Sequence, residues 1–155
     1  MYSEAGESMD LDGTDVKILR TLLSDARLSS RQIARKTGVS IGTVLSRMKK
    51  MEQAGIIKEY STIVDYEKLG YELTVVVEMT ISKGRLSEIA KEIAKTPNVC
   101  CVYNVTGLTD AMVIAKFKKR EDLSGFTKYL LSLPHVERTN THVVLTSMKE
   151  DFRLI

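Results

Sequence analysis

Several features that usually carry chemistry are scarce or missing in this 155-residue sequence. It has no run of 18 apolar residues, so we expect no membrane span. Its first ten residues, MYSEAGESMD, are acidic and lack the apolar segment of a secretory signal, so we expect a cytoplasmic protein. The only cysteines, Cys100 and Cys101, are adjacent and would point to opposite faces of a strand, which excludes a disulfide framework.

Catalytic and metal-binding patterns are missing as well. The two histidines, His135 and His142, have no Cys/His spacing typical of a zinc site. There is no glycine-rich phosphate loop and no serine in a nucleophile elbow. The residues therefore argue against an enzyme, and we expect neither a metal nor a cofactor.

Residues 29–57, SSRQIARKTGVSIGTVLSRMKKMEQAGII, have the pattern of two helices joined by a tight turn. Gly38 suits the end of the first helix, because glycine reaches a left-handed backbone conformation with little strain. Ser40 suits the N-cap of the second helix, and Gly55 its end. The second helix carries an apolar stripe at three- and four-residue spacing, made of Val44, Leu45, Met48 and Met51. This order of residues is typical of a helix-turn-helix.

The second of these helices is basic, which favours DNA over a helical hairpin packed for structure alone. Residues 27–58 contain eight Lys/Arg and one acidic residue, whereas residues 1–26 have a net charge of −4. A basic patch confined to one segment is typical of a nucleic-acid binder. The helix would enter the major groove, which is ~12 Å wide. The predicted DNA contacts are Arg31, Ser40, Ile41, Gly42, Thr43, Ser46, Arg47, Lys49 and Lys50.

Two of these positions have further consequences. We expect Arg47 and Lys50 to reach phosphates, because their side chains are long and charged. Gly42 lies inside the helix, where glycine is less stable than alanine by ~1 kcal/mol. It either allows the helix backbone to approach DNA closely or has no effect.

The rest of the first half completes this DNA-binding domain, predicted over residues 10–64. Residues 1–9 are small and acidic, and we expect them to be disordered. A first helix follows an N-cap chosen from residues 10–15, and Leu28 is expected to pack under the helix-turn-helix. Residues 57–64 alternate roughly and predict a short strand, and the polar segment 65–70 predicts a linker. The apolar positions of the first helix are Val16, Ile18, Leu19, Leu22 and Leu23.

The remaining residues, 71–155, contain a repeat of strand, helix, proline and strand. Pro97 and Pro134 each prevent a helix from continuing. The helices carry apolar residues at helical spacing, namely Leu86, Ile89 and Ile93, then Leu123, Phe126 and Leu130. The predicted strands are residues 72–81, 99–106, 111–118 and 136–146. This order predicts a ferredoxin-like βαββαβ domain, so the whole chain is an α+β protein with an N-terminal winged helix-turn-helix domain. One sheet face would lie on the helices, and the other, semi-apolar face predicts a homodimer.

Four stretches of this sequence resemble the Lrp/AsnC family of transcription regulators. They are LDGTDVKILRTLLSDARLSSRQIARKTGVS, SIGTVLSRMKKMEQAGIIKEYSTIVDYEKLG, VTGLTDAMVIAKF and LPHVERTNTHVVL. The resemblance implies a regulator that binds double-stranded DNA. It also implies a C-terminal domain that dimerises, assembles further into oligomers such as octamers, and binds amino acids between dimers.

In the family, the amino acid lies near a G-x-x-D turn and the last strand. The resemblance therefore assigns the effector site to Gly107, Asp110, Thr139 and Thr141. Asp110 would pair with the α-ammonium group of the effector. Thr109 stands where many members have an aromatic residue, and a turn without any effector is the alternative.

Taken together, the residues and the resemblance predict a sequence-specific DNA-binding transcription regulator, and the resemblance implies that it responds to an amino acid. Two rivals remain at this stage. One is an enzyme similar to sirohaem decarboxylases, which share the two-domain plan but need histidine and basic residues around a tetrapyrrole. The other is an architectural DNA-binding protein, whose affinity would ignore sequence.

Overall fold

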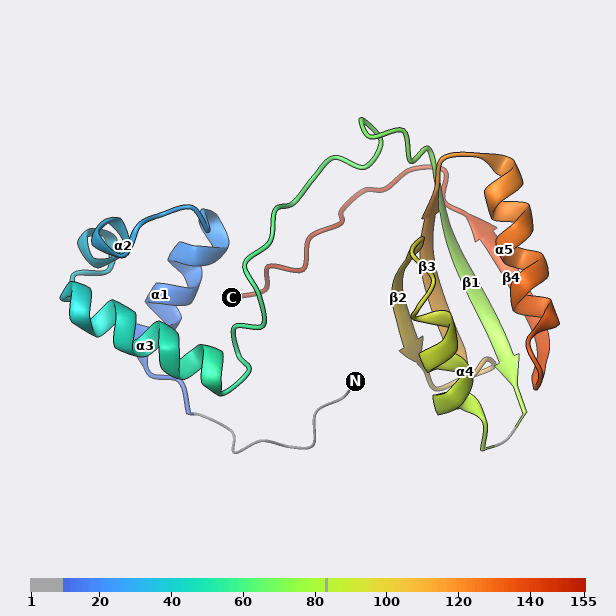
Figure 1. The fold of residues 1–155 in the computed structure, drawn as a ribbon, viewed down its shortest axis with the longest axis horizontal. Coiled ribbons are helices and arrows are strands. Elements are labelled where there is room, and N and C mark those ends of the chain that lie inside the picture. Colours follow the sequence, from blue (N-terminus) through green and yellow to red (C-terminus); the bar gives the residue numbers. More distant parts are fainter. Residues whose placement is uncertain (1–9, 83) are drawn as a thin grey trace. The chain divides into compact units, whose positions relative to one another are not determined.

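The computed structural model describes residues 10–82 and 84–155 (Figure 1). The predicted disordered tail, residues 1–9, lies outside the described residues. The chain divides into two compact units. The first unit runs up to Ile63 and includes Glu150–Ile155, and the second is Val64–Lys149. The last six residues thus group with the first unit, which differs from the predicted second domain of residues 71–155.

The first unit is built from α1 (Gly13–Ser24), α2 (Ser30–Thr37) and α3 (Ile41–Gln53). The predicted N-cap Ser40 accepts a hydrogen bond from the first turn of α3, and Ser29 caps α2 in the same way. These bonds satisfy backbone N–H groups that have no partner within the helix. The helices enclose a small apolar core made of Ile18, Leu19, Leu22, Ile33, Ala34, Val44 and Met51.

Two predictions for this unit are wrong. Leu45 was expected in the apolar stripe, but its side chain is 53% exposed. Val44 and Met51 are fully buried and set the rotation of α3, which turns Leu45 towards solvent. Residues 57–64 do not form a strand either, because they pair with no neighbouring strand among the described residues.

The second unit contains one four-stranded sheet with strand order β2-β3-β1-β4 (Figure 1). All its neighbouring strands are antiparallel. The strands are β1 (Leu73–Ile81), β2 (Val99–Asn104), β3 (Ala111–Phe117) and β4 (Val136–Val143). The helices are α4 (Leu86–Ile93) and α5 (Arg120–Ser132). The predicted ferredoxin-like arrangement is confirmed. Pro97 and Pro134 lie just beyond α4 and α5, as expected.

The sheet has a helix-covered face and an open face, because side chains alternate along each strand. Val75, Val77 and Met79 of β1 are buried with Ile93 of α4 and Leu130 of α5 in a single core. Cross-strand partners share a face, so the pairing assigns every strand residue to one side. The open face consists of Thr74, Val76, Glu78, Thr80, Cys101, Tyr103, Met112, Ile114, Lys116, Arg138, Asn140 and His142.

The segment before β1 is a hydrogen-bonded turn that belongs to the second unit. Asp65 accepts a hydrogen bond from the backbone N–H of Lys68 at 3.2 Å. The backbone N–H of Tyr71 donates to the carbonyl of Tyr66 at 2.9 Å. The Tyr66 ring lies 5.6 Å from the ammonium nitrogen of Lys116 on the sheet. These contacts tie the predicted linker, residues 65–70, to the sheet.

Candidate functional site

Helix α3 presents one side to solvent and the other to the core of the first unit. Val44 and Met51 are fully buried. With about 3.6 residues per turn, the opposite side carries Gly42, Ser46 and Lys49, all of which are exposed. We call this side the outward face of α3. It is the part of the unit that is free to enter a groove of DNA.

Most of the residues predicted to contact DNA lie on this face or beside it. Arg31 on α2 and Lys50 on α3 are exposed. Ser40 also holds the helix, because its hydroxyl accepts the backbone N–H of Thr43 at 3.1 Å and lies 2.8 Å from the Thr43 hydroxyl. The predicted contacts that lie along α3 or at its N-cap are Ser40, Ile41, Gly42, Thr43, Ser46, Lys49 and Lys50, the last of which is in the final turn.

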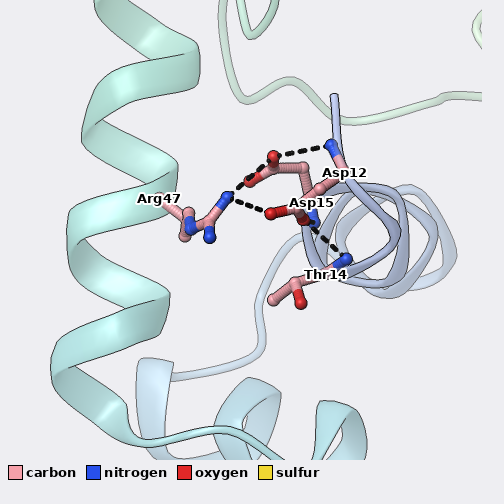
Figure 2. A network of polar contacts seen from close by, with 4 residues as sticks. All are labelled: Asp12, Thr14, Asp15 and Arg47. Atoms are coloured by element: carbon pink, nitrogen blue, oxygen red, sulfur yellow. Dashed lines mark hydrogen bonds and ion pairs between the residues drawn. The ribbon is translucent and has the colours of Figure 1, made fainter. Parts of the chain in front are cut away.

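Arg47 is not part of the outward face of α3, because its guanidinium group points towards α1 (Figure 2). Its Nη1 lies 2.6 Å from an Asp12 carboxylate oxygen and 3.0 Å from an Asp15 oxygen. The Asp15 side chain is 1% exposed, so its charge needs a counter-charge inside the fold. Arg47 therefore joins α3 to α1 through this ion-pair network.

The same two carboxylates also cap α1. Asp12 accepts the backbone N–H groups of Thr14 and Asp15, while Asp15 accepts that of Asp12, at distances of 2.8–3.1 Å (Figure 2). The bond from the Asp15 backbone, followed by that from Arg47, lowers the pKa of the Asp12 carboxyl. Asp12 in turn raises the pKa of Arg47. The second Asp15 oxygen, Oδ1, is buried and has no hydrogen-bond partner among the described residues.

The second unit has a cavity of about 210 Å³ on the open face of its sheet. It lies where the turn between β2 and β3 meets strands β1 and β4. Its lining includes a negatively charged side chain, Glu78, a positively charged one, Arg138, and the amide of Asn140. The Asn140 amide nitrogen donates to Glu78 at 3.3 Å, and the His142 ring lies 3.6 Å from the same carboxylate. The complete lining is Glu78, Thr80, Leu108, Thr109, Arg138 and Asn140.

The predicted turn residues Gly107 and Asp110 flank Leu108 and Thr109, which line this cavity, but neither of the two lines it. The Asp110 carboxylate is already engaged. It accepts the backbone N–H of Ile81 at 2.8 Å, at the point where the pairing of β1 with β4 shifts register. A strand residue at such a bulge loses its ladder partner, and Asp110 replaces it. Gly107 is exposed with φ +128°, a conformation that favours glycine.

The two predicted threonines of β4 lie on the other side of the sheet. Thr139 pairs with Met79 and Thr141 with Val77, and both partners belong to the helix-covered core. The neighbouring residues Arg138 and Asn140 line the cavity instead, together with Glu78 and Thr80, and the prediction did not include these four. Strand alternation was visible in the sequence, but it does not say which of two alternating sets faces the helices.

An N-terminal helix-turn-helix with a solvent-facing basic helix, followed by a separate domain with a cavity, defines a DNA-binding protein with a ligand-binding module. Comparison with known families agrees with this class. Residues 11–58 match the family described as winged helix-turn-helix DNA-binding. Residues 74–154 match the Lrp/AsnC ligand binding domain. The chain belongs to the Lrp/AsnC family of helix-turn-helix transcription regulators.

Relatives in this family are similar over almost their whole length. The chain is 49% identical to an uncharacterised HTH-type transcriptional regulator of Pyrococcus furiosus, covering 94% of this chain and 99% of the relative. It is 34% identical to the transcriptional regulator AzlB of Bacillus subtilis, covering 90% and 91%. A Neisseria meningitidis transcriptional regulator solved in complex with L-Met is 30% identical, with a TM-score of 0.86 and coverage of 94% and 97%.

The family membership decides between the main alternatives. The protein is a DNA-binding transcription regulator with a ligand-binding domain, and it is not an enzyme. The rival interpretation as a sirohaem decarboxylase is therefore set aside. No helix within residues 10–82 and 84–155 combines the length and the apolar character that crossing a membrane requires.

Proposed function

We propose that this cytoplasmic regulator recognises specific double-stranded DNA sequences through the outward face of α3. The exposed, basic character of that face supports the proposal, because a helix in the major groove needs both base contacts and phosphate contacts. Arg31, Lys49 and Lys50 supply the phosphate contacts. Arg47 does not, because its charge is used within the fold.

Selection from a random duplex library, followed by affinity measurements at fixed salt, tests this proposal. We expect the selected sequence to bind at least ~10³-fold more tightly than unrelated DNA. Lys50→Ala is expected to lower the salt slope by about one for all sequences, whereas Lys128→Ala on α5 serves as an exposed control and leaves it unchanged. Equal affinity for every sequence would favour an architectural protein instead.

We further propose that the effector is an amino acid held in the open-face cavity. Glu78 and Arg138 offer the two charges that a zwitterion requires, and Asn140 is held in place by its bond to Glu78. In this proposal the turn from Gly107 to Asp110 forms one wall. Asp110 acts by supporting β1 rather than by binding the ammonium group, and Thr139 and Thr141 take no part.

Titration calorimetry with the twenty amino acids tests the cavity. Arg138→Gln should abolish binding, because the effector carboxylate loses its cation. Thr139→Val removes only a hydroxyl on the opposite face, and we expect it to bind as the parent does. If Thr139→Val abolished binding while Arg138→Gln kept it, the effector would lie on the side of the threonines. If the parent chain bound no amino acid in the millimolar range, the protein would have no amino-acid effector.

We propose that the protein is a homodimer through the open sheet face and assembles further, for example into octamers. Val76 and Ile114, on the two central strands, make the centre of that face apolar, and a bare surface of this kind is unusual for a monomer. Light scattering of the parent chain tests this, together with Ile114→Glu, which should give monomers. Leu131→Glu on α5 is the control, since Leu131 is already exposed. A monomeric parent chain would contradict the proposal.

A further inference from the structure

Two large apolar side chains lie next to each other at the solvent-exposed start of α3. Ile41 is 42% and Leu45 is 53% exposed, and residues four apart on a helix are neighbours. Neither belongs to the core formed around Val44 and Met51. Single exposed leucines are ordinary, but this pair occupies the first turns of a recognition helix, which is the part that meets base edges.

Gly42 lies between this pair and Ser46, at the centre of the outward face. A Cβ atom built on Gly42 would meet only the Ser40 hydroxyl oxygen, at 3.8 Å, which is an ordinary contact. The fold therefore has room for a side chain here, although glycine weakens the helix. Because Gly42 has no side chain, another molecule can approach the helix backbone closely beside Ile41 and Leu45.

We propose that Ile41, Gly42 and Leu45 form an apolar notch that receives the C5-methyl groups of thymines in the major groove. Thymine is the base that presents a methyl group there, and apolar side chains recognise it by contact. Gly42 lets the base edge approach, while Leu45 and Ile41 enclose the methyl group. The exposed side chains of Lys49 and Lys50 bring the phosphates to this face. This inference rests on the proposed sequence-specific binding, and it identifies the thymine methyl group as the base feature that α3 recognises.

Deoxyuridine substitution tests the notch, because it removes a thymine methyl group and nothing else. Each thymine of the selected sequence is replaced in turn, and affinity is measured by fluorescence anisotropy at fixed salt. We expect the parent chain to lose about fourfold in affinity at each thymine that the notch reads. Leu45→Ala should bind the thymine and deoxyuridine forms equally at those positions, with an unchanged salt slope.

Two further variants sharpen the experiment. Gly42→Ala fills the notch, so it should weaken binding to the selected sequence without lowering the melting temperature. Leu131→Ala on α5 removes an equally exposed leucine, 58% exposed, and should keep the full discrimination between thymine and deoxyuridine.

The outcomes separate the notch from the proposed function. A chain that prefers no sequence would refute sequence-specific recognition itself. A chain that selects a sequence but binds all its deoxyuridine forms equally well reads no methyl group, which would overturn the notch alone. Parental discrimination by Leu45→Ala would likewise overturn it, because another residue would then contact the methyl.

Discussion

The two units of this protein place their helices by different physical means. In the first unit the core is small, and a buried carboxylate, Asp15, lies beside it with Arg47 of α3 as its counter-charge. In the second unit the core is larger and consists of apolar side chains from both the strands and the helices. A small core buries little apolar surface, so a single ion pair has more influence on where a helix lies.

The difference bears on function, because the two units meet different demands. A recognition helix must hold one orientation to fit a groove, and the network from Arg47 to Asp12 and Asp15 opposes rotation of α3 about its axis. In the second unit, the alternation of side chains along each strand fixes which face of the sheet meets the helices. A shift of one residue in strand pairing would expose all the apolar side chains of that strand. The cavity on the open face is therefore positioned by strand register.

Removal of Arg47 should have the largest effect on stability. Arg47→Ala leaves the Asp15 carboxylate buried without its cation, and we expect a larger fall in the free energy of unfolding than any other single substitution below produces. Urea unfolding followed by circular dichroism measures it, and the first unit should unfold before the second. The double variant Asp15→Leu/Arg47→Met removes both charges and should be close to the parent. Parental stability together with a lower salt slope in DNA binding would show that Arg47 contacts phosphate after all.

Truncation of the apolar core should cost slightly less in the second unit. Leu130 of α5 is fully buried, and Leu130→Ala is expected to lower the free energy of unfolding by about 3 kcal/mol. Leu131→Ala, one residue further along, should change it by no more than about 0.5 kcal/mol. The same urea experiment compares them. Equal effects of the two variants would mean that α5 is rotated relative to the sheet.

Loss of the Asp110 carboxylate should have a smaller and more local effect. Asp110→Ala leaves the Ile81 backbone N–H without its acceptor, at a cost of about 1–2 kcal/mol. Faster hydrogen exchange at the Ile81 amide should accompany it. Asp110→Asn keeps an acceptor oxygen and should cost less. If Asp110→Asn abolished amino-acid binding at parental stability, the carboxylate would touch the effector directly.

Acidification should have the smallest effect, and in the first unit Asp12 contributes to it. The folded-state pKa of Asp12 is below its ordinary value of 3.8. Its charge therefore contributes stability above pH 3.8, and this contribution is lost as the pH falls through the folded-state pKa. The melting temperature of the first unit, measured from pH 5 to pH 2, should decline in that window. Asp12→Asn should flatten the decline while keeping an N-cap, and an unaltered profile would rule out Asp12 as the titrating group.

Local patterns in the sequence determined most of the fold. Ser29, Ser40 and Gly38 mark helix boundaries through interactions with their own neighbours, so their positions follow from the chain alone. The repeated pattern of strand, helix and proline predicted the sheet domain, because each element signals itself by its own periodicity. The basic segment over residues 27–58 and the stretches shared with the family likewise needed no tertiary structure.

Only the tertiary structure decided which way individual side chains face. Arg47 is a basic helix residue in the sequence, and its use as the partner of Asp15 depends on α1 packing against α3. Arg138 and Thr139 are adjacent in the chain, and strand pairing sends one to the cavity and the other to the helices. Residues 57–64 alternate like a strand, but strand formation requires a neighbouring strand. Each of these outcomes depends on a group distant in sequence, which no local pattern records.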